Sequence, residues 1–597
     1  MRPPERGPGR PRLTEADPVR RARDCGVASY DYDLLIRGGT VVDGTGAPPR
    51  TADVAVEGGR IVDVGTLGAG GNGGARQLVD ADGALVMPGF VDIHTHYDGQ
   101  ATWDERLTPS SWLGVTTVVM GNCGVGFAPC RPEDRQRLIE LMEGVEDIPG
   151  TALHEGLPWT WTSFPEYLDH LSGRSFDIDL AAQVPHGAVR LHVMGERGAR
   201  REPADGEEIK EMGRIVREGI AAGALGFTTS RTMNHRTSRG EPTPTLTAAA
   251  DELVGIAAEM SGAGGVLEVV SDFRDLDAEF ATLRRMVEES GRPMTISVAA
   301  EDHRAYWGSL RDRIASAAAE GLPIKGQVGS RAIGVLLGLQ ASLNPFGGLP
   351  AYRSIAKEPI AERVRIMRDP AFKSRLLGEL DEGGPSGFLA GFDRMFQLGD
   401  PPNYEPDPST SVAARAAAAG RSPADLAYDL CVERDGTDFL YYPLFNWIGG
   451  SLDAVGDMLR DENLLPGLGD GGAHVGTICD GSFATTLLTH WARDRSEGLP
   501  LEWVVQRQCR DTAAAVGLCD RGVVAPGYRA DVVVVDFERL RLRPPEMAFD
   551  LPAGGKRLLQ RADGYLHTFV KGIETYANGE PTGALPGALV RGPQSVG

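Results

Sequence analysis

Two histidines separated by one residue lie in a short apolar segment near residue 94. The segment MPGFVDIHTHYD covers residues 87–98, and its apolar residues are typical of a buried β-strand. Side chains alternate between the faces of a strand, so Asp92, His94 and His96 share one face. Two imidazoles beside a carboxylate can bind a divalent metal ion, with the carboxylate fixing a tautomer. The spacing therefore predicts a metal site, and the alternative is a pair of polar residues on a solvated face.

Two more residues with chemically active side chains follow strand-like segments further along the chain. Cys123 comes after the apolar segment 115–120, and Asp470 ends the segment 465–470, just before two glycines. A lone cysteine is usually a small core residue, and an aspartate before glycine often forms a turn. At the carboxyl ends of strands, however, a thiolate can bind a metal and a carboxylate can act as a ligand or a base. We therefore predict that both residues belong to the site.

The elements that must position these residues alternate between strands and helices. Eight strands are expected, at residues 91–96, 115–120, 178–184, 224–229, 266–270, 294–298, 324–328 and 465–470. Helical stretches lie between most of them, which favours parallel βα units. Eight such units predict an α/β protein with a (β/α)8 TIM barrel, whose reactive residues belong at the carboxyl ends of the strands. The long gap before the last strand predicts a helical insertion or lid over about 340–460.

Both ends of the chain contain short strands separated by glycine turns. These β segments cover residues 32–88 and 519–585, and the simplest arrangement pairs them into one small β-sandwich domain. The barrel domain, residues 89–518, is then inserted between its two parts. Residues 1–31 are rich in Arg, Pro and Gly and are expected to be a disordered tail. Residues 586–597 are expected to be a second tail.

The overall composition excludes several classes of protein. The 597 residues carry a net charge of −22, which argues against binding to nucleic acid or to anionic membranes. The seven cysteines are scattered and odd in number, so they predict no disulfide framework and favour a reducing cytoplasm. No apolar run approaches the length needed to cross a bilayer. We expect a cytoplasmic enzyme that acts on a small molecule, and a homo-oligomer is left open.

A set of motifs runs along the whole chain. They are MPGFVDIHTHYD, TTVVMGNCGVGFAP, PHGAVRLHVMG, EGIAAGALGFTTS, GDGGAH and GVVAPGYRADVVVVD. Together they resemble the amidohydrolase superfamily, and within it the N-acyl-D-amino-acid deacylases (D-aminoacylases). The resemblance implies a zinc-dependent hydrolase of a non-peptide amide bond, acting on an N-acyl amino acid or a related small amide.

The resemblance also implies a role for each candidate residue. His94, His96 and Asp470 correspond to ligands of one metal, and Cys123 corresponds to the cysteine ligand of the tighter zinc. Zinc would lower the pKa of a water molecule toward neutrality. Asp470 would take the proton of that water as general base and pass it to the leaving amine as general acid.

The sequence departs from the family at two strand ends. The deacylases have a histidine at the end of strand five and another at the end of strand six, where this chain has Asp272 and Glu301 instead. One reading is a single zinc ion held by His94, His96 and Asp470. Another is that Asp272, Glu301 or another histidine replaces the missing ligands, which would allow two zinc ions. The remaining readings are a catalytically altered or inactive scaffold, and a different metal-assisted reaction such as cyclic amide opening or deamination.

Four further residues are candidates for contact with a substrate. His186 ends the third expected strand, and a buried structural role is its alternative. Arg231, His235 and Arg236 follow the fourth strand, where loops of a barrel face the site. The arginines could bind a substrate carboxylate in a bidentate manner, and their alternative is a solvated basic loop.

Overall fold

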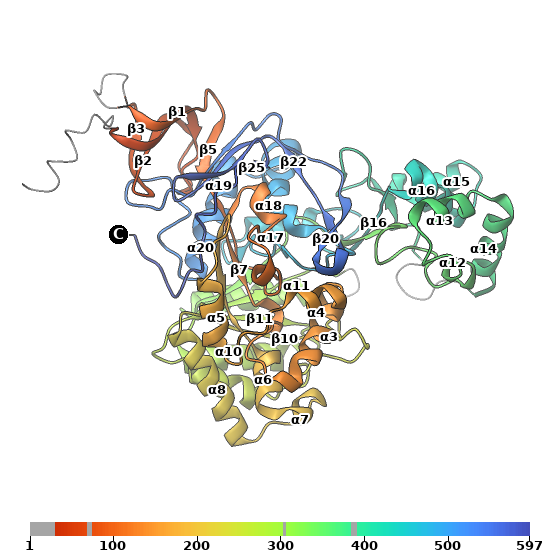
Figure 1. Cartoon of the computed structure of the whole chain (residues 1–597), viewed down its shortest axis with the longest axis horizontal. Helices are drawn as coiled ribbons and strands as arrows, with labels where there is room; N and C mark the ends of the chain where they lie inside the picture. Colours follow the sequence, from red (N-terminus) through yellow and green to blue (C-terminus); the bar gives the residue numbers. More distant parts are fainter. Residues whose placement is uncertain (1–29, 68–73, 302–305, 384–390, 597) are drawn as a thin grey trace, which may run out of the picture.

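The chain folds into a mixed α/β structure in the computed structural model (Figure 1). The structure describes residues 30–67, 74–301, 306–383 and 391–596. The expected N-terminal tail therefore lies almost wholly outside the described residues. The α/β class expected from the sequence is confirmed.

Two parallel sheets carry the segments that were predicted as strands. The first contains β6 (Phe90–Asp92), β7 (Val115–Met120) and β8 (Asp179–Ala182). The second contains β9 (Val184–Pro185), β10 (Gly226–Arg231), β11 (Val266–Ser271), β12 (Met294–Ser297), β13 (Ile324–Gln327) and β17 (Leu464–Leu465). All neighbours in these sheets are parallel and follow the order of the chain. The third predicted strand is divided at Gln183, so that β8 belongs to one sheet and β9 to the other.

The first and last strands are shorter than predicted. The expected strand 465–470 is present only as Leu464–Leu465 in β17. Pro466 has no N–H to donate to a neighbouring strand, and Asp470 has a left-handed backbone with φ of 48°. The ends of the two segments nevertheless meet, because Asp470 N donates to His94 O at 2.9 Å and His96 N donates to Gly471 O at 2.8 Å. This meeting brings residues more than 370 positions apart into one site.

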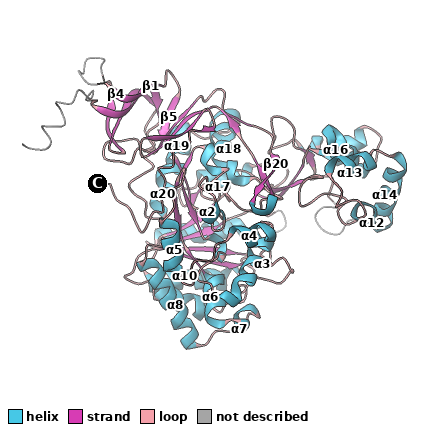
Figure 2. Ribbon diagram, viewed as in Figure 1, coloured by secondary structure: helices cyan, strands magenta, loops and turns pink. Residues whose placement is uncertain are grey.

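Helices follow most of the parallel strands. They are α3 (Arg135–Glu146), α5 (Phe164–Ser172), α6 (His186–Met194), α8 (Gly206–Ala221), α9 (Ala250–Ala258), α10 (Leu276–Ser290) and α11 (Tyr306–Ala319). Figure 2 shows α5, α6, α8 and α10 gathered in one half of the molecule. Helix α8 illustrates why these segments are helical. Asp205 and Glu208 form a capping box at its start, and apolar residues at helical spacing, such as Met212 and Val216, are buried.

The two ends of the chain share one nine-stranded sheet. Its N-terminal strands are β1 (Tyr32–Val41), β2 (Arg50–Glu57), β3 (Arg60–Gly65), β4 (Ala75–Asp80) and β5 (Leu85–Pro88). Its C-terminal strands are β18 (Val532–Val535), β23 (Tyr565–Val570), β24 (Ile573–Ala577) and β25 (Glu580–Pro581). Strand β18 pairs antiparallel with β5, which joins the two parts. All four residues of β18 are buried, in keeping with its central place in the sheet.

The segment between β13 and β17 forms a separate lobe with its own hydrophobic core. Strands β14 (Ile333–Leu337) and β16 (Leu440–Phe445) pair antiparallel at its root, and β16 also pairs with β15 (Phe396–Gln397). The helices beyond them are α12 (Pro350–Arg353), α13 (Ile360–Met367), α14 (Pro370–Gly383), α15 (Val412–Ala418) and α16 (Pro423–Val432). This lobe, green to cyan in Figure 1, projects from the rest of the molecule.

The C-terminal segment packs against the parallel strands. Gly587 exchanges two backbone hydrogen bonds with Phe176, and Val590 N donates to Leu180 O at 2.7 Å. The residues expected to form a tail therefore continue the structure beside β8. Among the described residues, no helix is both long and apolar enough to cross a membrane.

The buried side chain of Arg521 contacts residues of both β7 and β8, and these contacts lead to a prediction about stability. Arg521 donates to Asp179 Oδ2 at 2.9 Å and to Thr117 Oγ1 at 2.8 Å, and its side chain is 1% exposed. Replacing Arg521 by Met leaves buried carboxylates without this partner, which typically costs about 3–5 kcal/mol. We expect a lower urea midpoint of unfolding for Arg521→Met. Arg539→Met, at a side chain that is 85% exposed, is the control and should leave the midpoint unchanged; equal midpoints for the two variants would contradict the prediction.

Candidate metal centre

Four residues predicted from the sequence lie together where the parallel strands end. His94 Nε2 is 3.2 Å from Cys123 Sγ and 3.5 Å from Asp470 Oδ1. His96 Nε2 is 3.6 Å from the same carboxylate oxygen. One ligand atom each of His94, His96 and Cys123 lies within 4.8 Å of the others, and all three residues are buried. These distances leave room for one metal ion between the side chains.

Asp92, the last residue of β6, joins the segment that carries the histidines to the segment that carries Asp470. Its Oδ1 accepts from His94 N at 3.2 Å, and its carboxylate also accepts from the backbone of Gly469. A Cβ at Gly469 would lie 2.0 Å from Asp92 Oδ2, so only glycine fits there. Burial raises the pKa of Asp92 to about 8. The two halves of the centre are thus fixed against each other by backbone contacts to one side chain.

Gln327 on β13 sets the orientation of the His94 ring. Gln327 Nε2 donates to Thr295 Oγ1 at 2.7 Å, so its Oε1 faces His94 Nδ1 at 2.9 Å and accepts from it. This hydrogen bond places the ring proton on Nδ1 and leaves the Nε2 lone pair toward Cys123. Burial lowers the pKa of His94 to about 4, so the ring is neutral at pH 7.

The pKa values of His96, Asp470 and Cys123 are shifted both by burial and by nearby charged groups. Burial acts to lower the pKa of His96, but Glu146 and Asp470 raise it to about 9. Burial acts to raise the pKa of Asp470, but His96 and His94 hold it well below its usual range. Burial and the nearby carboxylates, Glu268 first, raise the pKa of the Cys123 thiol well above its ordinary value. A thiolate at this position therefore requires a cation beside it.

The donor set fits a divalent metal ion. Imidazole, thiolate and carboxylate are the ligand types that zinc binds. Buried carboxylates surround the ligands, and Glu146 Oε2 and Glu268 Oε1 have no hydrogen-bond partner among the residues that the structure describes. Buried negative charge is costly unless a positive charge lies next to it. A metal ion held by His94, His96, Cys123 and Asp470 would supply that charge.

A cavity of about 390 Å³ opens beside the ligands. Its polar lining residues include Thr232, Asn234, Ser271, Asp272, Ser297 and Glu301. Its apolar lining residues include Val145, Val270, Ile333, Leu444, Phe445, Leu468 and Ile478. Three of these, Ile333, Leu444 and Phe445, belong to the strands at the root of the inserted lobe. The cavity has the size and mixed lining typical of a small-molecule site.

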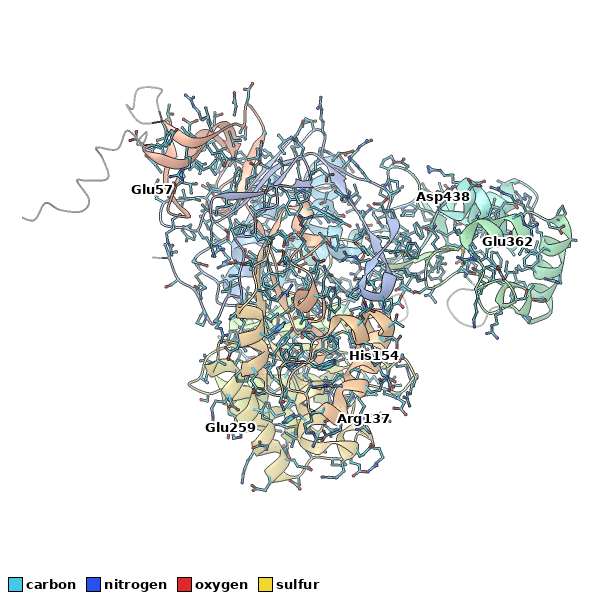
Figure 3. The ribbon with its side chains drawn as sticks, viewed as in Figure 1. Glu57, Arg137, His154, Glu259, Glu362 and Asp438 are labelled. Atoms are coloured by element: carbon cyan, nitrogen blue, oxygen red, sulfur yellow. The ribbon has the colours of Figure 1, made fainter. Side chains whose placement is uncertain are left out.

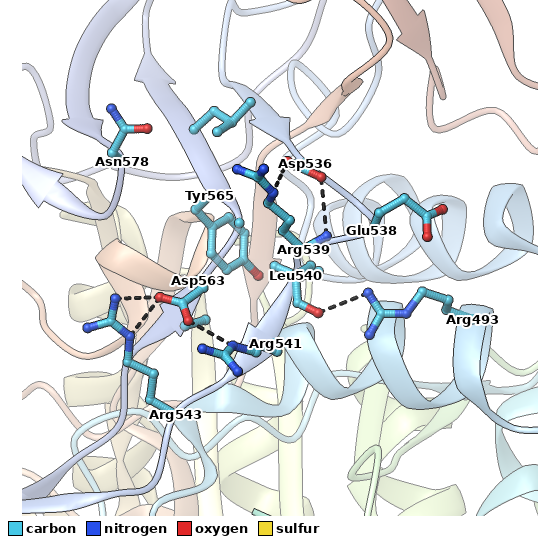
Figure 4. A pocket seen from close by; sticks show the side chains of 13 residues that line it. Arg493, Asp536, Glu538, Arg539, Leu540, Arg541, Arg543, Asp563, Tyr565 and Asn578 are labelled. Atoms are coloured by element: carbon cyan, nitrogen blue, oxygen red, sulfur yellow. Dashed lines mark hydrogen bonds and ion pairs between the residues drawn. The ribbon is translucent and has the colours of Figure 1, made fainter. Parts of the chain in front are cut away.

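A larger cavity of about 650 Å³ lies elsewhere and contains none of the candidate ligands (Figure 4). Three of its four arginines are paired with acids that line it, and the fourth, Arg493, donates to Leu540 O at 2.9 Å. Arg541 and Arg543 contact Asp563, and Arg539 contacts Asp536. Other charged side chains, such as Arg137 and Glu362, project from the surface of the molecule (Figure 3). We therefore assign the chemistry to the cavity at the strand ends.

The four candidate substrate contacts are placed differently from one another. His235 lines the cavity, its Nδ1 lies 2.8 Å from Ser230 Oγ, and burial lowers its pKa to about 3. His186 is instead buried beneath the strands, with Nε2 3.1 Å from Glu252 Oε1. Arg231 and Arg236 do not line the cavity: Arg231 pairs with Glu279 on α10, and Arg236 donates to Gly240 O. The nearby acid on α10 and the turn carbonyl explain why these arginines point away from the cavity.

Four residues of the centre were not identified from the sequence. They are Glu146, Glu268, Gln327 and His474. Glu268 and Gln327 could have been identified, because each is a polar residue within a predicted buried strand. A polar side chain is costly to bury unless it has a specific partner. His474 lies within the GDGGAH motif. Glu146 ends a helix far from any strand end in the sequence, and no local pattern marks it.

Comparisons with known proteins identify relatives of this chain. A model of the Amidohydrolase family matches residues 77–582. The chain is 27% identical over 511 residues to D-aminoacylase of Alcaligenes xylosoxydans xylosoxydans, covering 85% of this chain and 89% of that protein. It is 25% identical over 565 residues to N-acyl-D-aspartate deacylase of the same organism, covering 94% and 96%.

A solved structure of a D-aminoacylase, described in terms of its binuclear metal centre, superposes with a TM-score of 0.61 at 26% identity. The match covers 94% of this chain and 100% of that one. The family model spans far more than half of the chain, and the similarity to D-aminoacylase extends along nearly its whole length. The chain therefore belongs to the amidohydrolase family, as a D-aminoacylase-like hydrolase of carbon–nitrogen bonds other than peptide bonds.

Proposed function

We propose that the chain is a zinc-dependent deacylase of N-acyl amino acids or closely related small amides. The observation that carries this proposal is the convergence of His94, His96, Cys123 and Asp470 on one point beside a cavity of about 390 Å³. The relatives that deacylate N-acyl-D-amino acids support the substrate class.

We propose one zinc ion in this centre. A second ion needs further donors, and the position at the end of the fifth strand holds Asp272 in place of the family's histidine. Its carboxylate accepts from Thr232 Oγ1 at 2.5 Å and from Met233 N at 2.9 Å, which directs it into the loop after β10. The D-aminoacylase described above is characterised by activation with one metal and attenuation by a second, which is compatible with a single-ion enzyme.

When bound, zinc supplies a Lewis acid that polarises an amide carbonyl and lowers the pKa of water. Asp470 then acts as the proton carrier of the reaction. Its carboxylate is held ionised by the two imidazoles, so it takes a proton from the attacking water and delivers it to the leaving amine nitrogen. His94, with its proton fixed on Nδ1 by Gln327, keeps Nε2 free to bind the metal throughout.

The side chains that line the cavity suggest how a substrate is oriented in it. The apolar side chains Ile333, Leu444 and Phe445 offer contact area for an acyl chain. Thr232, Asn234 and the other polar lining residues offer hydrogen bonds to the amino-acid part. The amide then lies beside Asp470, His94 and Cys123, which line the same cavity.

We infer that the two parallel sheets form one (β/α)8 barrel inserted into a small β-sandwich domain. The order of the parallel strands and the bridge between Thr95 and Gly471 support closure of the barrel. We also infer a cytoplasmic enzyme, because the six cysteines among the described residues are free thiols.

The proposed function is tested by hydrolysis of a panel of N-acetyl-D- and N-acetyl-L-amino acids. We expect the zinc-loaded protein to release free amino acid, with the D series faster. Incubation with a chelator should abolish the rate, and zinc should restore it. His94→Ala should be inactive, whereas His567→Ala, whose ring contacts Glu574 in the nine-stranded sheet, should be active. A rate that survives complete removal of the metal would exclude the mechanism.

The role of Asp470 is tested by Asp470→Asn, which keeps the shape of the side chain but cannot accept the proton. General acid–base groups contribute about 10²–10⁴-fold, and we expect kcat to fall by an amount in this range. Asp272→Asn lies in the same cavity and should have a much smaller effect. If Asp272→Asn lost as much activity as Asp470→Asn, or if Asp470→Asn remained active, the proton carrier would have to be reassigned.

A further inference from the structure

Glu146 is the last residue of α3 and faces the metal centre from outside the strands. Its side chain is 1% exposed, and its Oε1 lies 3.1 Å from His96 Nδ1. The two atoms are close without the alignment of a hydrogen bond, so the contact is mainly one of charge. The other oxygen, Oε2, lies 3.9 Å from His474 Nε2 on the cavity wall. One carboxylate thus contacts a metal-ligand candidate and a cavity histidine.

The backbone holds Glu146 in this place. Glu146 O accepts from Val475 N at 3.0 Å, which ties the end of α3 to the segment that follows Asp470. Helix α3 ends here because Asp147 has a left-handed backbone with φ of 54°. The main chain thus holds the end of α3 in place, while the side chain of Glu146 faces His96.

The contact with Glu146 favours one tautomer of the His96 ring. A carboxylate beside Nδ1 favours a proton on that nitrogen, and the lone pair of Nε2 then points toward Asp470. Gln327 lies beside the same nitrogen of His94, but as a neutral amide whose oxygen accepts a hydrogen bond from it. The two histidines are therefore held from behind by two different groups, on α3 and on β13.

We infer that Glu146 is a positioning residue that keeps His96 in the tautomer that binds the metal. The inference rests on the proposed function, because it concerns the same metal centre. Glu146 itself touches neither the substrate nor the metal in this role. Its effect is expected on the affinity for the metal, and on the reaction only through that affinity.

The test is the zinc affinity of the full-length protein, measured by competition with a chromophoric chelator. Residues that orient metal ligands typically contribute about 10–100-fold to affinity, and we expect a loss in this range for Glu146→Gln. Glu146→Asp keeps the charge and should retain more affinity than Glu146→Gln. A variant that merely loosened the fold would show the loss for both substitutions alike, and equal losses would overturn the inference.

A matched control exists in Glu252, which is as buried as Glu146 and also contacts a histidine. Glu252 Oε1 lies 3.1 Å from His186 Nε2, away from the cavity. Glu252→Gln should lower the stability of the protein while leaving its zinc affinity unchanged. An unchanged affinity in Glu146→Gln, with the wild type binding zinc, overturns the inference alone. A wild-type protein that binds no zinc overturns the proposed function as well.

Discussion

Several acidic side chains are buried together at the ends of the parallel strands, next to the candidate metal ligands. Asp92, Asp98, Glu146 and Glu268 are all buried around the two histidines and Cys123. Without a cation, burial and mutual repulsion hold some of these groups protonated, as the raised pKa values of Asp92 and Glu268, about 8 in each case, indicate. A divalent ion removes much of this cost, so the metal and the carboxylates are required together.

The architecture meets this constraint by bringing distant segments to one point. His94 and His96 come from the segment just after the first strand, Cys123 from the loop after the second, and Asp470 from the segment after the last. Asp92 fixes the first segment to the last, and the steric fit at Gly469 allows no side chain between them. The inserted lobe reaches the same place with Ile333 and Phe445, so one cavity combines the metal ligands with an apolar wall. Each ligand candidate thus lies in a segment that follows the carboxyl end of a parallel strand.

Much of this arrangement could be predicted from residue patterns. Apolar segments that alternate with helical stretches predicted the parallel strands, although the third segment divides into β8 and β9. His94, His96, Cys123 and Asp470 were predicted from their places near the ends of these segments. The length of the last strand could not be predicted, because Leu468 continues the apolar pattern while Pro466 interrupts the pairing. The directions of Arg231 and His186 depend on Glu279 and Glu252, which lie on helices that only the folded chain brings near. Glu146 was missed for the same reason, since its partner His96 is 50 residues away in the chain.

The most direct measurement of the central claim is the X-ray absorption spectrum of the zinc-loaded protein at the zinc edge. If His94, His96, Asp470 and Cys123 hold the ion, the spectrum contains nitrogen and oxygen neighbours and one sulfur at about 2.3 Å. The sulfur contribution should disappear in Cys123→Ser while the histidine contribution persists. A wild-type spectrum with nitrogen and oxygen neighbours alone would contradict the assignment of Cys123, and a spectrum without histidine would contradict the centre as a whole.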